Sequence, residues 1–483
     1  MSDSRFTQPL CLRFAPSPTG ELHVGGLRTA LFNYLLRLKY GGRLILRIED
    51  TDAGRNIPDA ESHLIADLTW AGISFDEGIR EGGASTPYRQ SERGEFYRDA
   101  ILRLVEAGAV YRCWCEPERL AEARRTAEAA GLPPRYDRRC RKLPDVERRA
   151  LVSGASPFVW RLATPETGAV TVQDLIRGVV TFQTSHLDDP ILIRSDGSAT
   201  AVFAGAVDDL LMGITHIIRG EEWLASTPYQ LIIRRALGGI DPEFGHLPLL
   251  LAPDRSKLSK RHPGATVGDL REEGFLPGAL NRMLVAIGRG NLAHDEGWDM
   301  ESLADSFALN RYGRADAVFS MEMLNHQNGQ ALHRLTPETL DKYAQPFFSG
   351  EFPAALEWGA ARRQAALILA REGAPHLRAV TRQVGALFTE PILSSESFQP
   401  FPNARQLFSL AGQVLAGRPE VWQADDIKQT LAEIGNQMGV SGRELLMPLR
   451  LALTGTQHGP ELAAIAELLG REETVRRLTN AAR

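Results

Sequence analysis

The segment "RFAPSPTGELHVGGLRTALFNYLL" (13–36) constrains the fold of this chain more than any other. It starts within a short apolar run, Leu10 to Phe14, and from Leu27 its apolar residues recur at helical spacing. Two glycines follow at 41–42, and "RLILRIED" (43–50) has the pattern of a second strand. Strand, glycine-rich turn, helix and strand make a βαβ unit, which predicts a parallel sheet.

The turn between this strand and helix has the composition of a nucleotide-binding loop. N–H groups at the start of a helix favour anions, phosphates above all. Gly25 and Gly26 allow a ligand to approach the backbone because they carry no Cβ, and His23 can donate a hydrogen bond to a phosphate or a leaving oxygen. Taken alone, "HVGG" favours an ordinary glycine-rich turn with a surface histidine.

A second polar segment, "DRSKLSKRHPG" (254–264), places Lys257 and Lys260 three residues apart. Two ammonium groups at this spacing could clamp a polyphosphate as negative charge develops on it. The alternative is a solvated basic loop, which is the commoner meaning of such a run.

Composition narrows the class of protein. A chain of 483 residues with 43% hydrophobic and 24% charged residues is expected to form several globular domains. The net charge of -5 argues against general nucleic-acid binding, although local basic patches can still bind RNA. Four cysteines make no disulfide framework, the N-terminal residues have no export pattern, and no apolar run reaches membrane-spanning length. We therefore expect a cytoplasmic protein with no membrane partner.

The remaining chain predicts an interrupted α/β domain followed by helices. Strand patterns return at "PILIRSDG" (190–197) and "HIIRGEEW" (216–223), after a mixed, arginine-rich stretch over about 88–190. Beyond about residue 271 only helical patterns are found. Thr336-Pro337-Glu338 is typical of a helix start, and Ser441 with Glu444 predicts a capping box.

The two motifs on this architecture resemble the HIGH and KMSKS signatures of class I aminoacyl-tRNA synthetases. The segments "RIEDTD", "YRQSER", "VDDLLMGITHIIRGEEWLASTP" and "KLSKR" are similar to those of bacterial-type glutamyl-tRNA synthetases. The segment "MPLRLALTGTQHGPEL" (447–462) resembles that family's anticodon-binding region.

The resemblance implies a Rossmann-like α/β catalytic domain with an inserted α+β domain that binds the acceptor stem, followed by all-α stem-contact and anticodon-binding domains. The implied boundaries are 1–87 with 191–265 for the catalytic domain, 88–190 for the insert, 266–330 for the stem-contact domain and 331–483 for the anticodon-binding domain.

The implied reaction is activation of glutamate by ATP with Mg²⁺, then transfer of the glutamyl group from glutamyl-adenylate to the 3′ end of tRNA-Glu. The substrate carboxylate is itself the nucleophile, so the protein must supply orientation and charge stabilisation. We expect a monomer, and leave open whether tRNA-Gln is also a substrate.

The resemblance also implies two sets of site residues. Two arginines suit a dicarboxylic amino acid, because a guanidinium pairs a carboxylate in bidentate fashion, and a glutamate suits its α-ammonium group. The amino-acid set is Arg13, Ala15, Ser17, Glu49, Ala201, Gly205 and Arg219. The ATP set is Pro16, His23, Gly25, Gly26, Glu222, Lys257 and Lys260, of which His23, Lys257 and Lys260 are the expected catalytic residues.

The chain departs from the family pattern at one wall of the implied pocket. Where this chain has Ala201, the family usually has a tyrosine that lies against the amino acid, and near Gly205 it has asparagine or valine. The predicted pocket is therefore larger than in relatives. Either glutamate binds it weakly, or the cognate substrate is a larger or modified acidic amino acid.

A cysteine cluster lies in the stretch 88–190. Cys113, Cys115 and Cys140 offer soft thiolates at a spacing that suits a structural zinc ion, with three idle or buried thiols as the alternative. The resemblance implies Tyr136 as the fourth ligand, and it places Lys142 where other members have one. Residues 112–149 hold eleven Arg or Lys against seven Asp or Glu, a surplus that suits acceptor-stem phosphates or a solvated face.

Three other functions remain open at this point. A glutamyl transferase that modifies a tRNA base would lack the helical region 331–483. A tRNA-binding paralogue with weak turnover would not need His23 and the two lysines. Glutaminyl-tRNA synthetases resemble the chain less in "FAPSPTG" and "RIEDTD".

Overall fold

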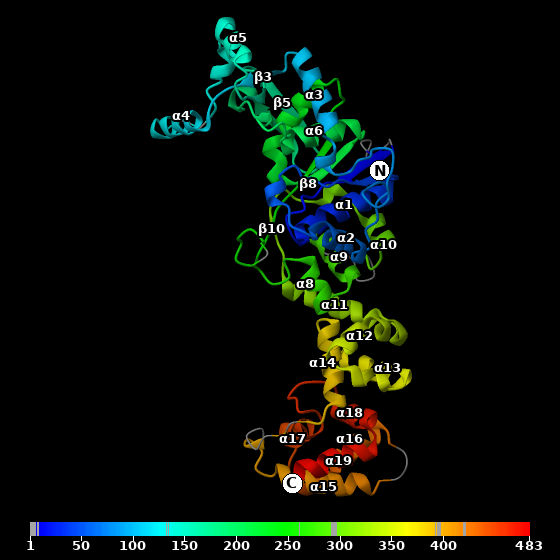
Figure 1. Cartoon of the computed structure of the whole chain (residues 1–483). Helices are drawn as coiled ribbons and strands as arrows, with labels where there is room; N and C mark the ends of the chain where they lie inside the picture. Colours follow the sequence, from blue (N-terminus) through cyan, green and yellow to red (C-terminus); the bar gives the residue numbers. More distant parts are fainter. Residues whose placement is uncertain are drawn as a thin grey trace. The chain divides into compact units, whose positions relative to one another are not determined.

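The computed structural model describes residues 6, 9–131, 133, 135–259, 261–290, 297–391, 393, 398–418 and 422–483. The chain forms two compact units (Figure 1): Met1–Asp269 with Asn281–Ser320, and Leu270–Leu280 with Met321–Arg483. None of the described helices is both long enough and apolar enough to cross a membrane.

The predicted βαβ unit is confirmed at the start of the chain. Strand β1 (Leu10–Phe14) pairs in parallel with β2 (Gly42–Leu46), and α1 (Val24–Tyr40) connects them. All of β1 is buried, and the helix ends at Gly41, whose φ is 76°. Pairing continues beyond the strands, because the Glu49 N–H donates to the Pro16 carbonyl at 2.9 Å. The residues after both strands therefore lie side by side.

A second sheet extends the first. Its strands follow the order β6-β5-β9-β8, with β8 (His216–Gly220) parallel to β9 (Glu243–Leu247). The Thr215 N–H donates to the Cys11 carbonyl at 2.9 Å, which joins the start of β8 to β1. The carboxyl ends of β1 and β8 thus meet, and in such sheets ligands bind at that edge.

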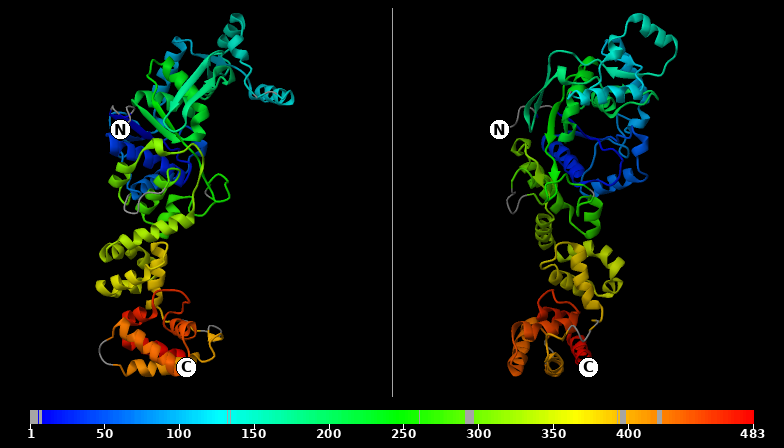
Figure 2. Two further views of the ribbon diagram at one scale, coloured as in Figure 1. Left: turned by 180° about the vertical axis from the view of Figure 1, so that it is seen from behind. Right: turned by 90° about the vertical axis from the view of Figure 1, so that its left-hand side faces the viewer.

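The stretch 88–190 contributes a separate small sheet and a hairpin. Strands β3 (Val110–Cys113), β4 (Val159–Leu162) and β7 (Ile191–Ile193) are antiparallel in that order. The hairpin of β5 (Ala169–Asp174) and β6 (Gly178–Gln183) joins the larger sheet, where β5 meets β9 in parallel. Helices α4 (Pro117–Ala129) and α5 (Asp145–Ser153) have no buried residue and lie at the periphery of this unit (Figure 2).

The helices around this sheet carry or support the site. Behind it, α6 (Ala201–Leu211) packs with α3 (Gly94–Glu106) and α7 (Thr227–Ala236) around a core that includes Phe203 and Leu104. The other helices of the unit are α2 (Ala60–Trp70) and α10 (Met300–Ser306). The unit boundaries fall inside α8 (Val267–Glu273) and α9 (Pro277–Ala286).

The described residues of the second unit form helices joined by loops, with no strand among them. Helices α12 to α14 pack together, and α15 to α19 form a further group (Figure 1). The bounds are α11 (Met321–Arg334), α12 (Pro337–Glu351), α13 (Ala360–Ala370), α14 (Leu377–Phe388), α15 (Ala404–Ala416), α16 (Ala424–Met438), α17 (Gly442–Thr454), α18 (Leu462–Leu469) and α19 (Arg471–Ala482).

Two details of the helical region test the sequence predictions. Thr336 caps α12 as predicted, because its side chain accepts the Thr339 N–H. The predicted capping box of α17 is wrong. Ser441 is the N-cap, but its side chain makes no cap hydrogen bond, because the chain enters the helix through Gly442 at φ 52°. A two-residue strand, β11 (Ala317–Val318), pairs with β10 (Leu250–Leu251), and two residues are too short to give a sequence pattern.

Gly42 is a backbone requirement of the βαβ unit. Its φ is 105°, and a Cβ there would overlap the backbone of Leu10, with which it pairs. We predict that Gly42→Ala lowers the free energy of unfolding of the first unit by roughly 3 kcal/mol or more. The control is Gly41→Ala, with φ 76° and ψ -178° but no atom within 4 Å of the added Cβ, which should cost only its backbone strain, about 1–3 kcal/mol. Urea unfolding compares them, and equal losses would contradict the overlap.

Candidate active site

Two adjoining cavities lie at the carboxyl ends of β1 and β8. The first has a volume of about 370 Å³ and the second about 330 Å³. They share His23, Gly26, Thr29, Gly220 and Glu222 as lining residues. One ligand could therefore extend from one cavity into the other.

The predicted site residues gather around these cavities. Those predicted for the amino acid all line the first cavity: Arg13, Ala15, Ser17, Glu49, Ala201, Gly205 and Arg219. Of those predicted for ATP, the first cavity is lined by Pro16, His23, Gly26 and Glu222, and the second by His23, Gly25, Gly26, Glu222 and Lys257. Lys260 lies outside the described residues. The individual roles of these residues stay predictions.

His23 is the N-cap of α1. Its Nδ1 accepts a hydrogen bond from the Gly25 N–H at 3.2 Å. A neutral imidazole that accepts at Nδ1 carries its proton on Nε2, so this tautomer can donate from Nε2. The Val24 N–H donates to the Ala265 carbonyl at 3.0 Å. The first two N–H groups of the helix are thus already engaged, and anion binding depends more on side chains than the sequence indicated.

Backbone hydrogen bonds join the loop of His23 to residues 265–267, which directly follow the basic segment 254–264. Beside the Val24 bond, the Val267 N–H donates to the Leu22 carbonyl at 2.9 Å, and His23 forms an antiparallel bridge with Thr266. At the other end of the basic segment, Lys257 forms a bridge with Leu251. Lys257 is thereby held at the wall of the second cavity, close in space to the loop of His23.

A buried charge network forms the floor of the first cavity. Arg13 Nε and Arg47 donate to the same oxygen of Asp209, at 3.1 and 2.7 Å, and Arg47 also donates to Glu49 at 2.9 Å. Burial alone would raise the pKa of Asp209, but Arg13 and Arg47 lower it to about 2. The carboxylate binds fewer protons when folded, so its contribution to stability is present above about pH 4 and lost as the pH falls toward 2.

Arg219 carries its charge without an acidic partner. It is 6% exposed, and no carboxylate of the described residues lies within 4 Å of its guanidinium. Its hydrogen bonds go to His246, to Thr227 and to the Trp223 carbonyl. Burial, followed by the neighbouring Arg13, lowers its pKa to about 9. An anion that enters the cavity and pairs with Arg219 would offset the free-energy cost of burying its charge.

Sequence reasoning missed three cavity residues. Arg47 and Asp209 stand in quoted motifs, but the ion pair that joins them spans 162 positions, which no local pattern reports. Gln230 on α7 is 7% exposed, and its side-chain oxygen has no hydrogen-bond partner in the described part of the chain. A Cβ on Gly205 would lie 3.4 Å from its amide nitrogen, so Gln230 fills part of the wall opened by Gly205 and Ala201.

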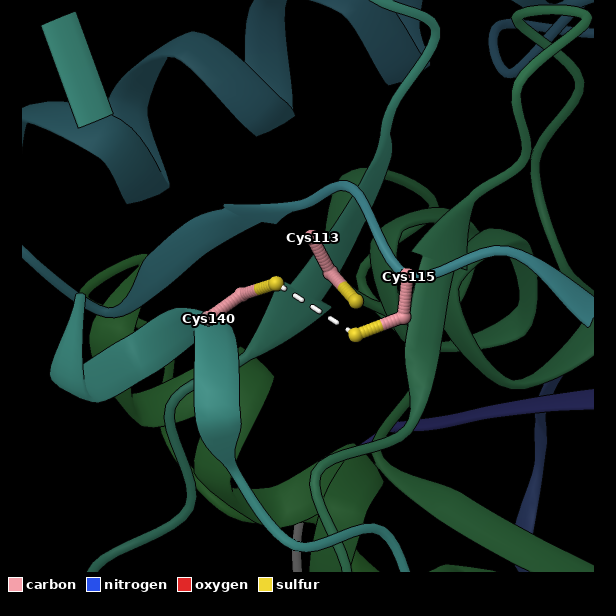
Figure 3. A group of neighbouring side chains, drawn as sticks. All are labelled: Cys113, Cys115 and Cys140. Carbon is pink, nitrogen blue, oxygen red and sulfur yellow. Dashed lines mark hydrogen bonds between the residues drawn. The ribbon is translucent and has the colours of Figure 1, made fainter. Parts of the chain in front are cut away.

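The cysteine cluster lies apart from these cavities. The sulfur atoms of Cys113, Cys115 and Cys140 all lie within 4.8 Å of one another (Figure 3). The Tyr136 hydroxyl is 3.3 Å from the sulfur of Cys113 and 3.6 Å from that of Cys115. The hydrogen bond from Cys140 is the main cause that lowers the pKa of Cys113, to about 4. Three sulfurs and one phenol oxygen thus converge as zinc ligands would, whereas Lys142 is exposed.

An α/β domain with a glycine-rich loop after its first strand and a lysine-bearing loop beside it is the arrangement expected of the catalytic domain of a class I aminoacyl-tRNA synthetase. Residues 9–326 match the family model of class I tRNA synthetases (E and Q), catalytic domain, and residues 339–482 match that of an anticodon binding domain. The chain belongs to this family of class I tRNA synthetases.

Its relatives match over nearly their whole length. It is 40% identical to the glutamate–tRNA ligase of Heliobacterium modesticaldum, covering 98% of this chain and 96% of that one. It is also 40% identical to that of Moorella thermoacetica, covering 98% of each. A crystal structure of a glutamate tRNA ligase from Elizabethkingia meningosepticum in complex with its amino acid superposes with a TM-score of 0.86 at 32% identity, over 98% of this chain and 99% of that one.

Two of the three buried arginines of the first cavity, Arg47 and Arg219, should respond oppositely to removal. Arg47→Met would leave Asp209 and Glu49 without their shared cation, so we predict a loss of about 3–5 kcal/mol in the free energy of unfolding. Arg219→Met removes an uncompensated charge, and Thr227 can then donate to the His246 ring nitrogen 3.2 Å away. We predict a change within about 1 kcal/mol or a gain in stability. Urea unfolding measures both, and a large loss for Arg219→Met would contradict the assignment.

Proposed function

We propose that this chain is a glutamate–tRNA ligase that uses MgATP and glutamate as substrates and tRNA-Glu as acceptor. The observation that carries the proposal is the unneutralised Arg219 in a cavity that adjoins the phosphate loop. The ligase names of full-length relatives support it.

The geometry supports one orientation of the substrate. Its side-chain carboxylate pairs with Arg219 and Arg13, and its α-ammonium lies near Glu49, whose second oxygen accepts no hydrogen bond from the described residues. The α-carboxylate is then directed toward the second cavity. There an oxygen of it attacks the α-phosphorus of ATP, and the bond to the β-phosphate breaks to release pyrophosphate. His23, Lys257 and Lys260 stabilise the charge that develops on the leaving phosphates.

The remaining domains would hold tRNA. We assign residues 88–190 to the acceptor stem, 266–330 to stem contact and 331–483 to the anticodon. The basic surplus of residues 112–149 supports the first of these, because α4 and α5 have no buried residue and leave most of their side chains exposed to solvent. We also expect the protein to be a monomer in the cytoplasm. Whether it charges tRNA-Glu alone or tRNA-Gln in addition stays open.

A second candidate is ligation of a larger acidic amino acid, and the wall at Ala201 and Gly205 favours testing it. Ala201 begins α6 at the cavity, and a Cβ on Gly205 would come within 3.8 Å of a Glu49 oxygen. Both small residues enlarge the cavity beside the groups that would hold the substrate. The charges suit an acidic amino acid of either size.

We predict that the parent enzyme shows a high KM for glutamate and accepts bulkier acidic analogues, and that Ala201→Tyr lowers this KM by roughly 10- to 100-fold and excludes the analogues. A tyrosine hydroxyl would add a charge-assisted hydrogen bond, worth about 1.5–3 kcal/mol, and its ring would fill the wall. The measurement is aminoacylation of purified tRNA-Glu and tRNA-Gln with a panel of acidic amino acids.

The KM for ATP serves as the internal control, because Ala201 does not line the second cavity. An unchanged glutamate KM together with an unchanged analogue profile would show that Ala201 does not contact the substrate. Charging of neither tRNA with any acidic amino acid would overturn the proposed function itself.

We further propose that Cys113, Cys115, Cys140 and Tyr136 hold a structural zinc ion, which would fix the loop after β3 to the segment around Cys140. We predict about one zinc per chain by elemental analysis of protein never exposed to chelator. Tyr136→Phe should release zinc to a chromophoric chelator faster than the parent, because phenylalanine offers no oxygen ligand. Cys11→Ser, outside the cluster, should retain it. Metal-free parent protein would remove the proposal.

A further inference from the structure

We infer that Asp174 and His246 are positioning residues, which hold Arg219 in the orientation that receives the substrate carboxylate. The inference rests on the proposed function, because it assigns a purpose to the surroundings of Arg219. The three side chains form one buried hydrogen-bonded chain that starts in the β5–β6 hairpin and ends at the first cavity.

His246 is the centre of this chain. Its side chain is fully buried on β9, and its Nδ1 lies 2.6 Å from a carboxylate oxygen of Asp174. A carboxylate facing Nδ1 keeps the proton on that nitrogen, so Nε2 is left as an acceptor. Arg219 Nε donates to this Nε2 at 3.1 Å. Phe244 stacks on the imidazole with an interplanar angle of 7°, which fixes the plane of the ring.

The guanidinium of Arg219 is therefore fixed by neutral acceptors. His246 receives the Nε proton, and Thr227 Oγ1 accepts from a terminal nitrogen at 2.9 Å. A carboxylate in either place would hold the group equally well but would neutralise it, as Asp209 and Glu49 do for Arg47. Neutral partners fix the direction of the guanidinium and leave its charge for a ligand. Orientation without neutralisation is what pairing with a substrate carboxylate requires.

Asp174 does not need His246 to remain satisfied. Its Oδ1 accepts the N–H groups of Ile176 and Arg177 at 2.9 and 2.8 Å, and the backbone N–H of His246 donates to Oδ2 at 3.1 Å. Replacing the imidazole therefore leaves the carboxylate hydrogen-bonded and the turn after β5 intact. Because these backbone donors stay in place when the ring is replaced, the positioning role of His246 can be tested separately from folding.

The test is the kinetics of His246→Phe and His246→Gln in the full chain. Phenylalanine keeps the stacked ring and removes the acceptor, whereas the glutamine amide oxygen can again accept from Arg219. We expect His246→Phe to raise the glutamate KM about tenfold or more, with kcat and the KM for ATP little changed, and to lower selectivity for glutamate over glutamine. His246→Gln should recover most of both losses, at unchanged melting temperature.

Should His246→Phe fail to fold, His246→Asn replaces it, because its amide can still donate to Asp174 but does not reach Arg219. An unchanged glutamate KM and selectivity would overturn the inference, as would equal losses in the phenylalanine and glutamine variants. Arg219→Met separates the two levels of the proposal. If it raises the glutamate KM while His246 variants do not, only the positioning role fails; if it leaves that KM unchanged, the proposed function of the cavity fails as well.

Discussion

One carboxylate oxygen of Asp209 receives hydrogen bonds from two arginines, and the site is built on that contact. Arg13 comes from β1, Arg47 from the residues that follow β2, and Asp209 from α6, so the contact joins three elements that are far apart in sequence. The side chain of Arg47 is fully buried, and burial alone would lower its pKa, yet Asp209, Glu49 and Asp208 together raise it above its ordinary value. A cation in such surroundings is a structural element, because its removal strands the carboxylates around it.

The third buried arginine of the same cavity, Arg219, has the opposite surroundings. Arg219 ends β8 beside the carboxylates of the network but has only neutral hydrogen-bond acceptors within reach. Folding therefore stores the cost of one uncompensated charge at the place where a ligand enters. An acidic ligand recovers that cost on binding, and a neutral isostere such as an amide does not. Under the proposed function, discrimination between acid and amide would follow from leaving one guanidinium unpaired, with no need for a group that repels the amide.

The sequence was sufficient to predict helices, strands and turns, whose signals lie within a few residues. It was insufficient to predict the side chains that pair across distant parts of the chain. Apolar spacing and the glycines at 41–42 predicted β1, α1 and β2 correctly, and the resemblance drew together residues that the structure places around one cavity. The N-cap of α12 at Thr336 was predictable because the capping residue and the helix are adjacent in sequence. The predicted capping box at Ser441 was wrong because Gly442 changes the path by which the backbone enters α17. Asp209 lies 196 positions from Arg13 and 162 from Arg47, and His246 lies 27 positions from Arg219. Periodicity along the sequence carries no record of such distant pairs.

Under the proposed function, the residues that would recognise the charge of the substrate are separate from those that would limit its size. Charge is set by Arg13, Arg219 and Glu49, which are fixed by buried hydrogen bonds to the surrounding fold. Size is set by Ala201, Gly205 and Gln230 on the helices α6 and α7, where a small side chain leaves space and alters none of those hydrogen bonds. A change at the α6 wall can therefore widen the range of accepted side chains while the demand for an acidic group persists. Under the proposed function, alanine and glycine at that wall would admit a larger acidic side chain without weakening the requirement for an acidic group.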